Sequence, residues 1–582
     1  MVLAHDRRLP AVGPRRAAHQ TSGGRALADG DDCCARVLLL RSAVGGSAGR
    51  GIAVDRVRHR GGGDHGPALV PWRDGTVRRR TPWIVAICLL AALPVSCDGE
   101  SIDAALPGRA GLIAPVGPVA RGCAGVSVHP SEDVQSVIDA HAAGTTYCLS
   151  PGVYRLEQPL EPKRGDALIG RQGAVVSGSK VLTGWRRNGG VWSTTGFLPA
   201  KPGNHGECLD SVPTCAYTED VFVDKRRLRR VGSKSAVTVG TVHADYGTNT
   251  ITIGDDPRLH LVEQAVAPSL IRATVDKVVV ANLVLEQAAN EAQVAAVEAR
   301  RTTPYGMGSD WRISHNEVRL NHGVGLGLAD GAVVTANLVH HQGQLGFGAW
   351  GNGSVVSGNE ISFNGMAGYS PDWEAGGSKS WHTDRHTVRH NYVHDNHGPG
   401  LWTDGGNMRT DYSFNKITGN WGAGIQHEMS YDATIKENEI TGNGRRHKGW
   451  AWEAGIQIQS SGGTGLIEVA GNTLGDNANG IALIESGGRL DEQPAPYGPH
   501  VVRNVWVHDN RVRLSAGQTT GAVQDIGDTT VYTGAGNRFE NNTYVVSSLN
   551  GRYFSWNDTD LTWTEWLVAG NDNGGRAERT GR

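Results

Sequence analysis

One phrase recurs through the second half of the chain and constrains its fold more than any other feature. It begins with Asn, has a branched apolar residue two positions later and closes with two nearby Gly residues followed by an apolar or aromatic one. It starts at Asn316, Asn337, Asn359, Asn391 and Asn415, and its second Gly follows the Asn by nine residues every time, while the period varies from 21 to 32 residues. A constant unit with joins of variable length predicts a solenoid of stacked coils.

Each repeat contains short alternating runs of β-branched residues, separated by the Gly and Asn that tight turns need. Two to three strands in each repeat are typical of a parallel β-helix. An Asn at the same turn of every coil can form a ladder of amide hydrogen bonds along the solenoid. We therefore interpret one Asn series as structural: Asn316, Asn337, Asn359, Asn391, Asn415, Asn438 and Asn472.

From about residue 123 onward the pattern resembles the right-handed parallel β-helix, or pectin-lyase-like, superfamily, and its polysaccharide-active branch in particular. The resemblance implies an all-β solenoid with a capping helix at its N-terminal end and a β-rich insertion near the first coils. It also implies a carbohydrate substrate, although the repeat is far more specific for fold than for substrate.

The N-terminal region differs from the rest of the chain in charge. Residues 1–80 carry 15 Arg, no Lys and 7 acidic residues, which leaves 41 basic and 51 acidic residues in the remainder. An acidic body argues against nucleic acid as a partner. Because no Met occurs between Met1 and Met307, we expect translation to begin near Val77 and residues 1–76 to be a mis-assigned or disordered extension.

Residues 77–97 predict export. They read VRRRTPWIVAICLLAALPVSC, in which three Arg precede an apolar core of about a dozen residues, too short for a membrane span. The segment resembles a bacterial lipoprotein signal with Cys97 as the lipidated residue, although Pro94 stands where Leu is usual. We expect an extracellular or surface-anchored protein that meets the membrane only through this anchor.

Four cysteines follow Cys97, at Cys123, Cys148, Cys208 and Cys215. In an exported chain four cysteines suggest two disulfides, for which three pairings exist. Proximity in the sequence favours Cys123 with Cys148 and Cys208 with Cys215. The spacings contain no CxxC pair and do not indicate a zinc site.

The remaining segments are assigned by composition and periodicity. A helix with its N-cap at Ser131 and an apolar stripe of Val134, Val137 and Ile138 would cap the open end of the solenoid. A basic run, Lys225 to Arg230, either binds an anionic substrate or forms a solvated strand face. The expected division is a linker at 98–122, the N-terminal cap and first coils at 123–174, the β-rich insertion at 175–265, regular coils at 266–550 and a C-terminal cap and tail at 551–582.

Alternation along each strand predicts one outward column of acidic residues. The residue four positions after each anchoring Gly should face solvent, which gives the column Ala329, Trp350, Asp372, Asp404, Glu428 and Gln459. Carboxylates on neighbouring coils, about 4.8 Å apart, repel one another, so a cluster of three is hard to justify by stability alone. Close carboxylate pairs suit glycoside hydrolysis, and we predict that Asp372, Asp404 and Glu428 are catalytic and need no cofactor.

The same carboxylates support a second interpretation. Together with Glu374 they could bind Ca²⁺, which takes several oxygen ligands. Glu374 and Lys379, five residues apart, resemble the Glu to Lys arrangement of the chondroitinase B and alginate lyase group, which implies Glu374 as a calcium ligand and Lys379 as the base. Where those lyases carry an Arg-His pair, this chain has Trp402 and Thr403.

Aromatic and amide side chains beside the acids are candidate sugar contacts, because exposed Trp rings can stack on sugar rings. The expected substrate-binding residues are Trp350, Trp402, Gln426, Gln457, Gln459, Arg445, Trp450 and Trp452. A monomeric hydrolase acting on a polysaccharide or oligosaccharide is the first hypothesis. A calcium-dependent uronate lyase and a non-catalytic glycan-binding or surface structural protein are the alternatives.

Overall fold

The computed structural model describes residues 110–299, 308–446, 449, 451–486 and 498–581. All of them belong to the second of two compact units, Asp98–Arg582. Three predictions fall outside the described residues: the export signal at 77–97, the lipidation of Cys97 and the extension at 1–76.

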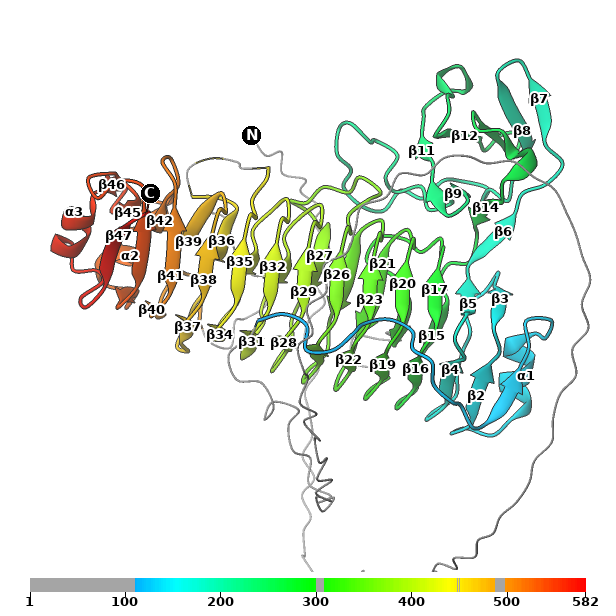
Figure 1. The fold of residues 1–582 in the computed structure, drawn as a ribbon, viewed down its shortest axis with the longest axis horizontal. Helices are drawn as coiled ribbons and strands as arrows, with labels where there is room; N and C mark the ends of the chain where they lie inside the picture. Colours follow the sequence, from blue (N-terminus) through cyan, green and yellow to red (C-terminus); the bar gives the residue numbers. More distant parts are fainter. Residues whose placement is uncertain (1–109, 300–307, 447–448, 450, 487–497, 582) are drawn as a thin grey trace, which may run out of the picture. The chain divides into compact units, whose positions relative to one another are not determined.

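Three sheets wind through the unit, and each regular coil contributes one strand to each of them (Figure 1). Within a coil the chain passes from sheet A to sheet B to sheet C, then returns to sheet A one layer further on. Sheet A is parallel throughout and contains β1 (Val126–Val128), β2 (Thr146–Leu149), β4 (Ala167–Gly170), β16 (Val279–Ala281), β19 (Arg312–Ser314), β22 (Val333–Thr335), β25 (Val355–Ser357), β28 (Thr387–Arg389), β31 (Thr410–Ser413), β34 (Ala433–Lys436), β37 (Ile467–Ala470), β40 (Val505–His508) and β43 (Arg538–Glu540).

Sheet B is also parallel and contains β3 (Gly152–Arg155), β5 (Ala174–Ser177), β17 (Val284–Glu286), β20 (Glu317–Arg319), β23 (Leu338–His340), β26 (Glu360–Ser362), β29 (Tyr392–His394), β32 (Lys416–Thr418), β35 (Glu439–Thr441), β38 (Thr473–Gly475), β41 (Arg511–Leu514), β44 (Thr543–Val546) and β47 (Arg576–Arg579). Sheet C contains β15 (Ile271–Ala273), β18 (Ala295–Ala299), β21 (Val324–Leu328), β24 (Leu345–Ala349), β27 (Gly376–Ser380), β30 (Leu401–Asp404), β33 (Ile425–Glu428), β36 (Ala454–Gln459), β39 (Asn479–Glu485), β42 (Thr520–Gln524), β45 (Phe554–Trp556) and β46 (Thr559–Leu561). Only its last pair, β45 and β46, is antiparallel. The expected all-β solenoid is confirmed.

The predicted Asn ladder is confirmed at the turn between sheets A and B. The side chain of Asn391, for example, accepts hydrogen bonds from the backbone and the side chain of Asn359, and it donates to the side chain of Asn415. The ladder extends beyond the predicted series to Asn510 and Asn542. A second ladder runs along the turn between sheets B and C, through Asn321, Gln342, Asn364, Asn396, Asn420, Asn443 and Asn477.

The glycines of the repeat are required by the close approach of successive coils. A Cβ at Gly377 would lie 2.2 Å from the carbonyl oxygen of Gly400, and one at Gly400 would lie 2.7 Å from that of Gly424. No side chain fits at such distances. One correction to the sequence interpretation follows: in the coil that begins at Asn359 the stacked glycine is Gly377, not Gly368, because nine extra residues precede β27.

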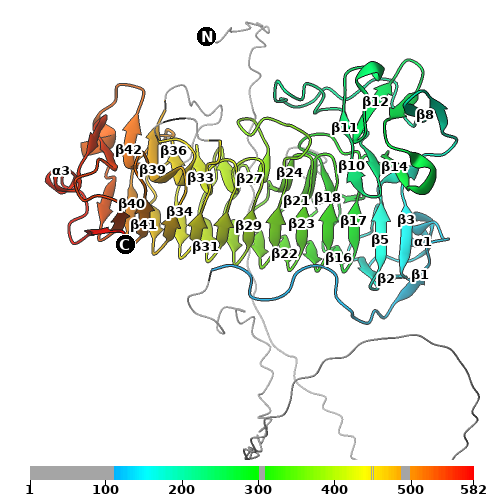
Figure 2. The same cartoon turned by 45° about the horizontal axis from the view of Figure 1, so that its top comes forward.

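The β-rich insertion leaves the solenoid after β5 and returns before β15, as expected. It forms two small sheets, seen above the N-terminal coils in Figure 2, and two short 3₁₀ helices. Its elements are β6 (Ser179–Val181), β7 (Arg186–Asn188), β8 (Val191–Thr195), β9 (Val221–Val223), β10 (Arg226–Arg227), β11 (Arg229–Arg230), η2 (Lys234–Ala236), β12 (Thr241–Asp245), β13 (Thr250–Ile253), η3 (Pro257–Leu259) and β14 (Val262–Ala265).

Short helices lie at both ends of the solenoid. The N-terminal helix, α1 (Val134–Ala140), buries Val134 and Ile138, but its N-cap is Asp133 rather than Ser131. Asp133 accepts a hydrogen bond from the backbone of Gln135, the usual function of an N-cap carboxylate. At the other end lie α2 (Thr530–Thr533) and α3 (Trp563–Val568).

The segment expected as a linker packs along the coils where it is described. The backbone of Gly111 donates to the carbonyl of Phe414, Gly117 to that of Ala336, and Val119 to the side chain of Asn282. Residues 110–119 therefore follow the turns between sheets A and B back toward the first coil (blue in Figure 1). Among the helices of the described residues, none is long and apolar enough to cross a membrane.

Both predicted disulfides are confirmed: Cys123 pairs with Cys148 and Cys208 with Cys215. The first joins the chain before β1 to sheet A. The second closes a loop of the insertion that contacts the solenoid. There the backbone of Cys208 pairs with that of Tyr369 in an isolated antiparallel β-bridge.

Candidate active site

A groove follows the outer face of sheet C. It consists of three adjoining cavities of about 360, 680 and 520 Å³. The first two share Lys379 and Asp404, and the second and third share Arg272 and Val294. The groove therefore extends from β36, through β30 and β27, to β15 and the insertion.

Strand register places two outward columns at the centre of this groove. The pairing of Ser380 with Thr403 sets Lys379 beside Trp402 and Trp381 beside Asp404. The next two pairings continue both columns without a shift. The first column is Lys379, Trp402, Gln426 and Gln457, and the second is Trp381, Asp404, Glu428 and Gln459.

The predicted position of Asp372 in the second column is wrong, because Trp381 occupies that place. Counting from Gly368 instead of Gly377 shifted this coil by nine residues. Tyr369, which follows Gly368, packs with Trp373 and the Cys208–Cys215 loop. Asp372 lies in the extra loop before β27. It nevertheless lines the same cavity as Asp404 and Glu428. The three predicted carboxylates therefore share a cavity, although Asp372 reaches it from a loop and not from the strand column.

Lys379 lies at the point where the first two cavities join. Its ammonium group is 2.9 Å from Oδ2 of Asp404 and 3.1 Å from Oε1 of Glu374, donates to the carbonyl of Trp373 and lies 4.2 Å from the ring centre of Trp402. Burial by itself would lower the pKa of Lys379, but the charges of Asp404 and Glu374 outweigh it and hold the pKa above its ordinary value. Lys379 is therefore a cation at neutral pH.

Glu428 is held in a different environment from Asp404. Its side chain is buried, and Oε2 accepts hydrogen bonds from Nε1 of Trp402 and from Nε2 of Gln426. Asp404 keeps one oxygen, Oδ1, without a hydrogen-bond partner among the described residues. Neighbouring carboxylates in unlike environments are the usual arrangement for dividing acid and base roles.

Two of the four carboxylates considered for Ca²⁺ are already neutralised by a side chain. The ammonium of Lys379 occupies the space between Glu374 and Asp404, where a bound cation would be needed. Across the described ranges, no three His, Cys, Asp or Glu side chains gather as metal ligands.

The expected substrate contacts divide into three groups. Trp402, Gln426, Gln457, Gln459 and Trp452 line the first cavity, and Trp350 lines the second. Arg445 lies elsewhere: it pairs with Asp395 at the turn after β29 and lines none of the three cavities. Trp450 is outside the described residues. Trp402 is only 3% exposed beneath Lys379, so little of its ring faces the groove.

Several residues of the groove were not singled out from the sequence, among them Trp373, Trp381 and Glu453. Trp381 is 42% exposed and directly follows β27. Correct assignment of the stacked glycine as Gly377 would have placed it in the column of Asp404. For Trp373 and Glu453, which lie in loops, the repeat carried no signal.

Comparison with known proteins agrees with the stacked coils. The sequence pattern described as "Right handed beta helix region" matches residues 305–414 and 383–493. Together with the parallel sheets, this match decides the fold. The chain is a right-handed parallel β-helix.

Several solved structures are similar to this chain. XylC, determined in complex with xylose, is 16% identical over 68% of this chain and 83% of its own, with a TM-score of 0.50. The A-module of the Azotobacter vinelandii mannuronan C-5 epimerase AlgE6 is 14% identical over 77% of this chain and 95% of its own, with a TM-score of 0.43. The GH87 α-1,3-glucanase of Streptomyces thermodiastaticus is 12% identical over 80% of this chain and 70% of its own, with a TM-score of 0.38. At 16% identity the likeness to XylC shows the fold alone. No curated protein sequence matches the chain.

Proposed function

We propose that this β-helix is a glycoside hydrolase that cleaves a neutral or amino-bearing polysaccharide in the groove of sheet C. The observation that carries the proposal is the pair Asp404 and Glu428. They lie in register on adjacent strands, line one cavity and have different partners.

The spacing of the pair supports a retaining mechanism. Adjacent strands lie about 4.8 Å apart, close to the ~5–5.5 Å between the carboxyl groups of retaining glycosidases. In this mechanism Asp404 attacks the anomeric carbon and the bond to the leaving oxygen breaks, while Glu428 gives that oxygen its proton. Glu428 then takes a proton from water, whose oxygen displaces Asp404 from the sugar. Lys379 positions Asp404, and Asp372 is the alternative acid.

The charges of the groove argue against the uronate lyase alternative. Its three cavities are lined by two cations, Arg272 and Lys379, and by eight acids: Glu219, Glu291, Glu298, Asp372, Glu374, Asp404, Glu428 and Glu453. Such a groove repels a polyuronate. A lyase would also need Lys379 as an unprotonated base, whereas its raised pKa keeps it protonated.

We further propose that the protein acts outside the cytoplasm, which the two disulfides support. Export through residues 77–97, lipidation of Cys97 and the monomeric state stay predictions.

The decisive experiment is incubation of purified protein with a panel of neutral, amino-bearing and uronate polysaccharides, with and without chelator. Reducing ends and ultraviolet absorbance are measured in parallel. We expect reducing ends without absorbance and no effect of chelator. Chelator-sensitive absorbance would establish the lyase instead, and binding without any product would favour the glycan-binding alternative.

Variants of the pair test the assignment. Asp404→Asn and Glu428→Gln should each lower turnover by about 10²–10⁴-fold while leaving the fold intact. Glu439→Gln, on the exposed surface of β35, is the matched control and should be as active as the wild type. Full activity of Asp404→Asn would refute the mechanism.

A further inference from the structure

A separate cavity lies at the seam between the insertion and the coils. Its volume is about 540 Å³, within the range of small-molecule sites. One wall comes from residues 212–230 and Val242 of the insertion, and the other from the turns that join sheets B and C, including Leu320, His322 and His341. It shares no lining residue with the groove.

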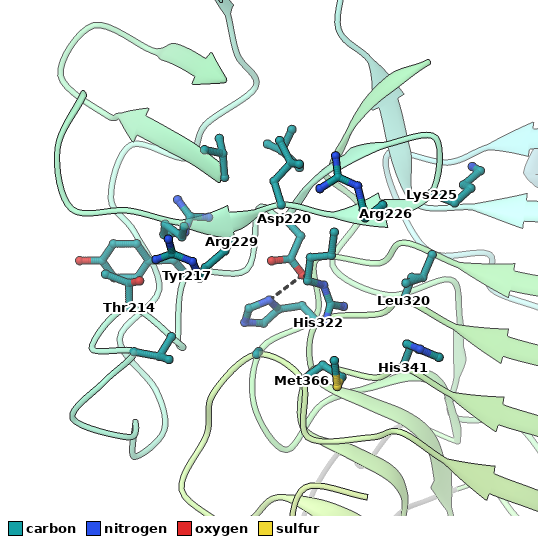
Figure 3. Close-up of a pocket in the computed structure, with 17 residues that line it drawn as sticks. Thr214, Tyr217, Asp220, Lys225, Arg226, Arg229, Leu320, His322, His341 and Met366 are labelled. Carbon is teal, nitrogen blue, oxygen red and sulfur yellow. Dashed lines mark hydrogen bonds and ion pairs between the residues drawn. The ribbon is translucent and has the colours of Figure 1, made fainter. Parts of the chain in front are cut away.

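The cavity has the opposite charge to the groove. Asp220 is its single acidic lining residue, and it is hydrogen-bonded to His322 as Figure 3 shows. Five cations line the cavity, all from the basic run of the insertion: Lys225, Arg226, Arg227, Arg229 and Arg230. The basic run Lys225 to Arg230 therefore lines a cavity of its own. It is not simply a solvated strand face, and it does not line the groove.

Four of the five cations are already paired with carboxylates. The pairs are Lys225 with Glu263 and Glu286, Arg226 with Asp255, Arg227 with Asp220, and Arg230 with Glu219. Arg229 differs from them. Within the part of the chain that the structure describes, its guanidinium has no ion pair or hydrogen bond, although it lines the cavity (Figure 3).

The rest of the lining is largely apolar. Val221, Leu228 and Leu320 are buried, whereas Met366 is 40% exposed. His341 adds no charge, because burial lowers its pKa to about 4. Arg229 is exposed, and it lines the same cavity as these apolar side chains. A cavity with an unpaired guanidinium and apolar walls fits a ligand with an anionic head and an apolar body, since Arg presents a planar set of donors that matches oxyanions.

We propose that this cavity binds a small organic anion, whose oxyanion head pairs with Arg229 and whose apolar body contacts Leu320 and Met366. The site does not depend on the proposed hydrolase activity, because it has its own walls and its own charge. A free organic acid and an acidic substituent carried on a glycan share this chemistry, and the test separates them.

The test is calorimetric titration of the wild-type protein with 2-naphthoate, with its neutral counterpart 2-naphthamide and with inorganic phosphate. We expect one site for 2-naphthoate and at least about tenfold weaker binding of the amide, because a charge-assisted hydrogen bond is lost. Inorganic phosphate, which lacks the apolar body, should also bind more weakly than 2-naphthoate. Equal affinity for acid and amide would overturn the proposal.

Two variants locate the site. Arg229→Gln should weaken 2-naphthoate about tenfold and leave 2-naphthamide unchanged, and Met366→Glu should weaken both. Arg171→Gln, at an exposed Arg of the first coils that lines none of the four cavities, is the matched control. Unchanged 2-naphthoate binding in Arg229→Gln would refute the site, and unfolding curves of each variant check that it is folded.

The source of the anion is decided by competition. A uronate oligosaccharide that displaces 2-naphthoate identifies a glycan substituent, and its failure to do so identifies a free organic acid. Glycan turnover by Arg229→Gln should equal that of the wild type. The anion site and the hydrolase activity can therefore fail independently. 2-Naphthoate binding tests the anion site, and glycan turnover tests the hydrolase.

Discussion

Lys379 controls the charge balance at the centre of the groove. It is 12% exposed and faces two carboxylates, Glu374 and Asp404, that are nearly as buried as it is. Removing the cation leaves two negative charges close together in a place where water screens them poorly. The ammonium group of Lys379 therefore stabilises the centre of the groove.

Replacement of Lys379 by Met should destabilise the protein by about 3–5 kcal/mol at neutral pH, because it leaves buried charges unpaired. The folded-state pKa of Lys379 lies above its ordinary value of 10.5. Its stabilising effect is therefore complete below pH 10.5 and is lost as the pH rises through the folded-state value. Urea unfolding of both proteins should show a difference that shrinks above pH 10.5, and a difference that grows there would contradict the assignment.

Trp381 is the most exposed Trp among the described residues of the groove and directly precedes Asp404 in the outward column. Trp381→Ala should raise KM for the polysaccharide about three- to tenfold and change kcat little, because an aromatic contact is lost from binding rather than from chemistry. Trp506→Ala, on β40 of sheet A, serves as the control. A large fall in kcat with unchanged KM would instead place Trp381 in the reaction itself.

At the scale of elements, the short strands are held together by their turns. The strands of sheets A and B have three or four residues, so each buries few side chains. The amide ladders supply hydrogen-bond partners to the backbone groups at the turns between these strands. Asn391 is a representative member. It is fully buried, and it donates to the carbonyls of Val356 and Arg389 in addition to its ladder contacts.

Asn391→Ala should lower the free energy of unfolding by about 3 kcal/mol or more, because several buried donors and acceptors lose their partners together. Asn352→Ala, at an exposed turn, should be nearly neutral. Chemical denaturation of both variants measures the contrast. Equal stability of the two would mean that the ladder contributes little.

Over the whole molecule, charge is divided between two sites of opposite sign. The groove of sheet C is acidic, and the cavity beneath the insertion is basic. The insertion contributes to both: Glu219 lines the groove, while its partner Arg230 lines the basic cavity. One added segment thus contributes to two surfaces of opposite charge.

The acidic groove should retain a polysaccharide with free amino groups better than a neutral one, and should not retain a polyuronate. Retention of the amino-bearing polymer should weaken as salt is added, because exposed charges are screened within about 10 Å at 0.1 M salt. Affinity electrophoresis of the Asp404→Asn, Arg229→Gln double variant, in which the proposed anion site is also removed, measures binding to the groove without turnover. Preference for a polyuronate at low salt would contradict this account of the groove.

The repeat was enough to predict the class of fold. Asn and Gly recur because each coil needs the same hydrogen-bonded turn and the same close contact with the next coil. The period of the sequence therefore equals the period of the coils. The cysteine pairs followed from proximity and export. The position of Asp404 beside Glu428 also followed, because alternation along a strand and stacking between coils are both periodic.

What lies outside the repeat was decided by tertiary structure. The extra loop before β27 moved Asp372 out of its expected column and brought Trp381 in, and Lys379 became the partner of Asp404 only through the pairing of Ser380 with Thr403. The basic cavity depends on segments about a hundred residues apart in the chain. The sequence by itself determined the coils, since turn residues and alternating apolar residues specify them and recur in every repeat. The chemistry of the groove and the cavity was settled only by folding, because loops and an insertion meet there through contacts that no period encodes.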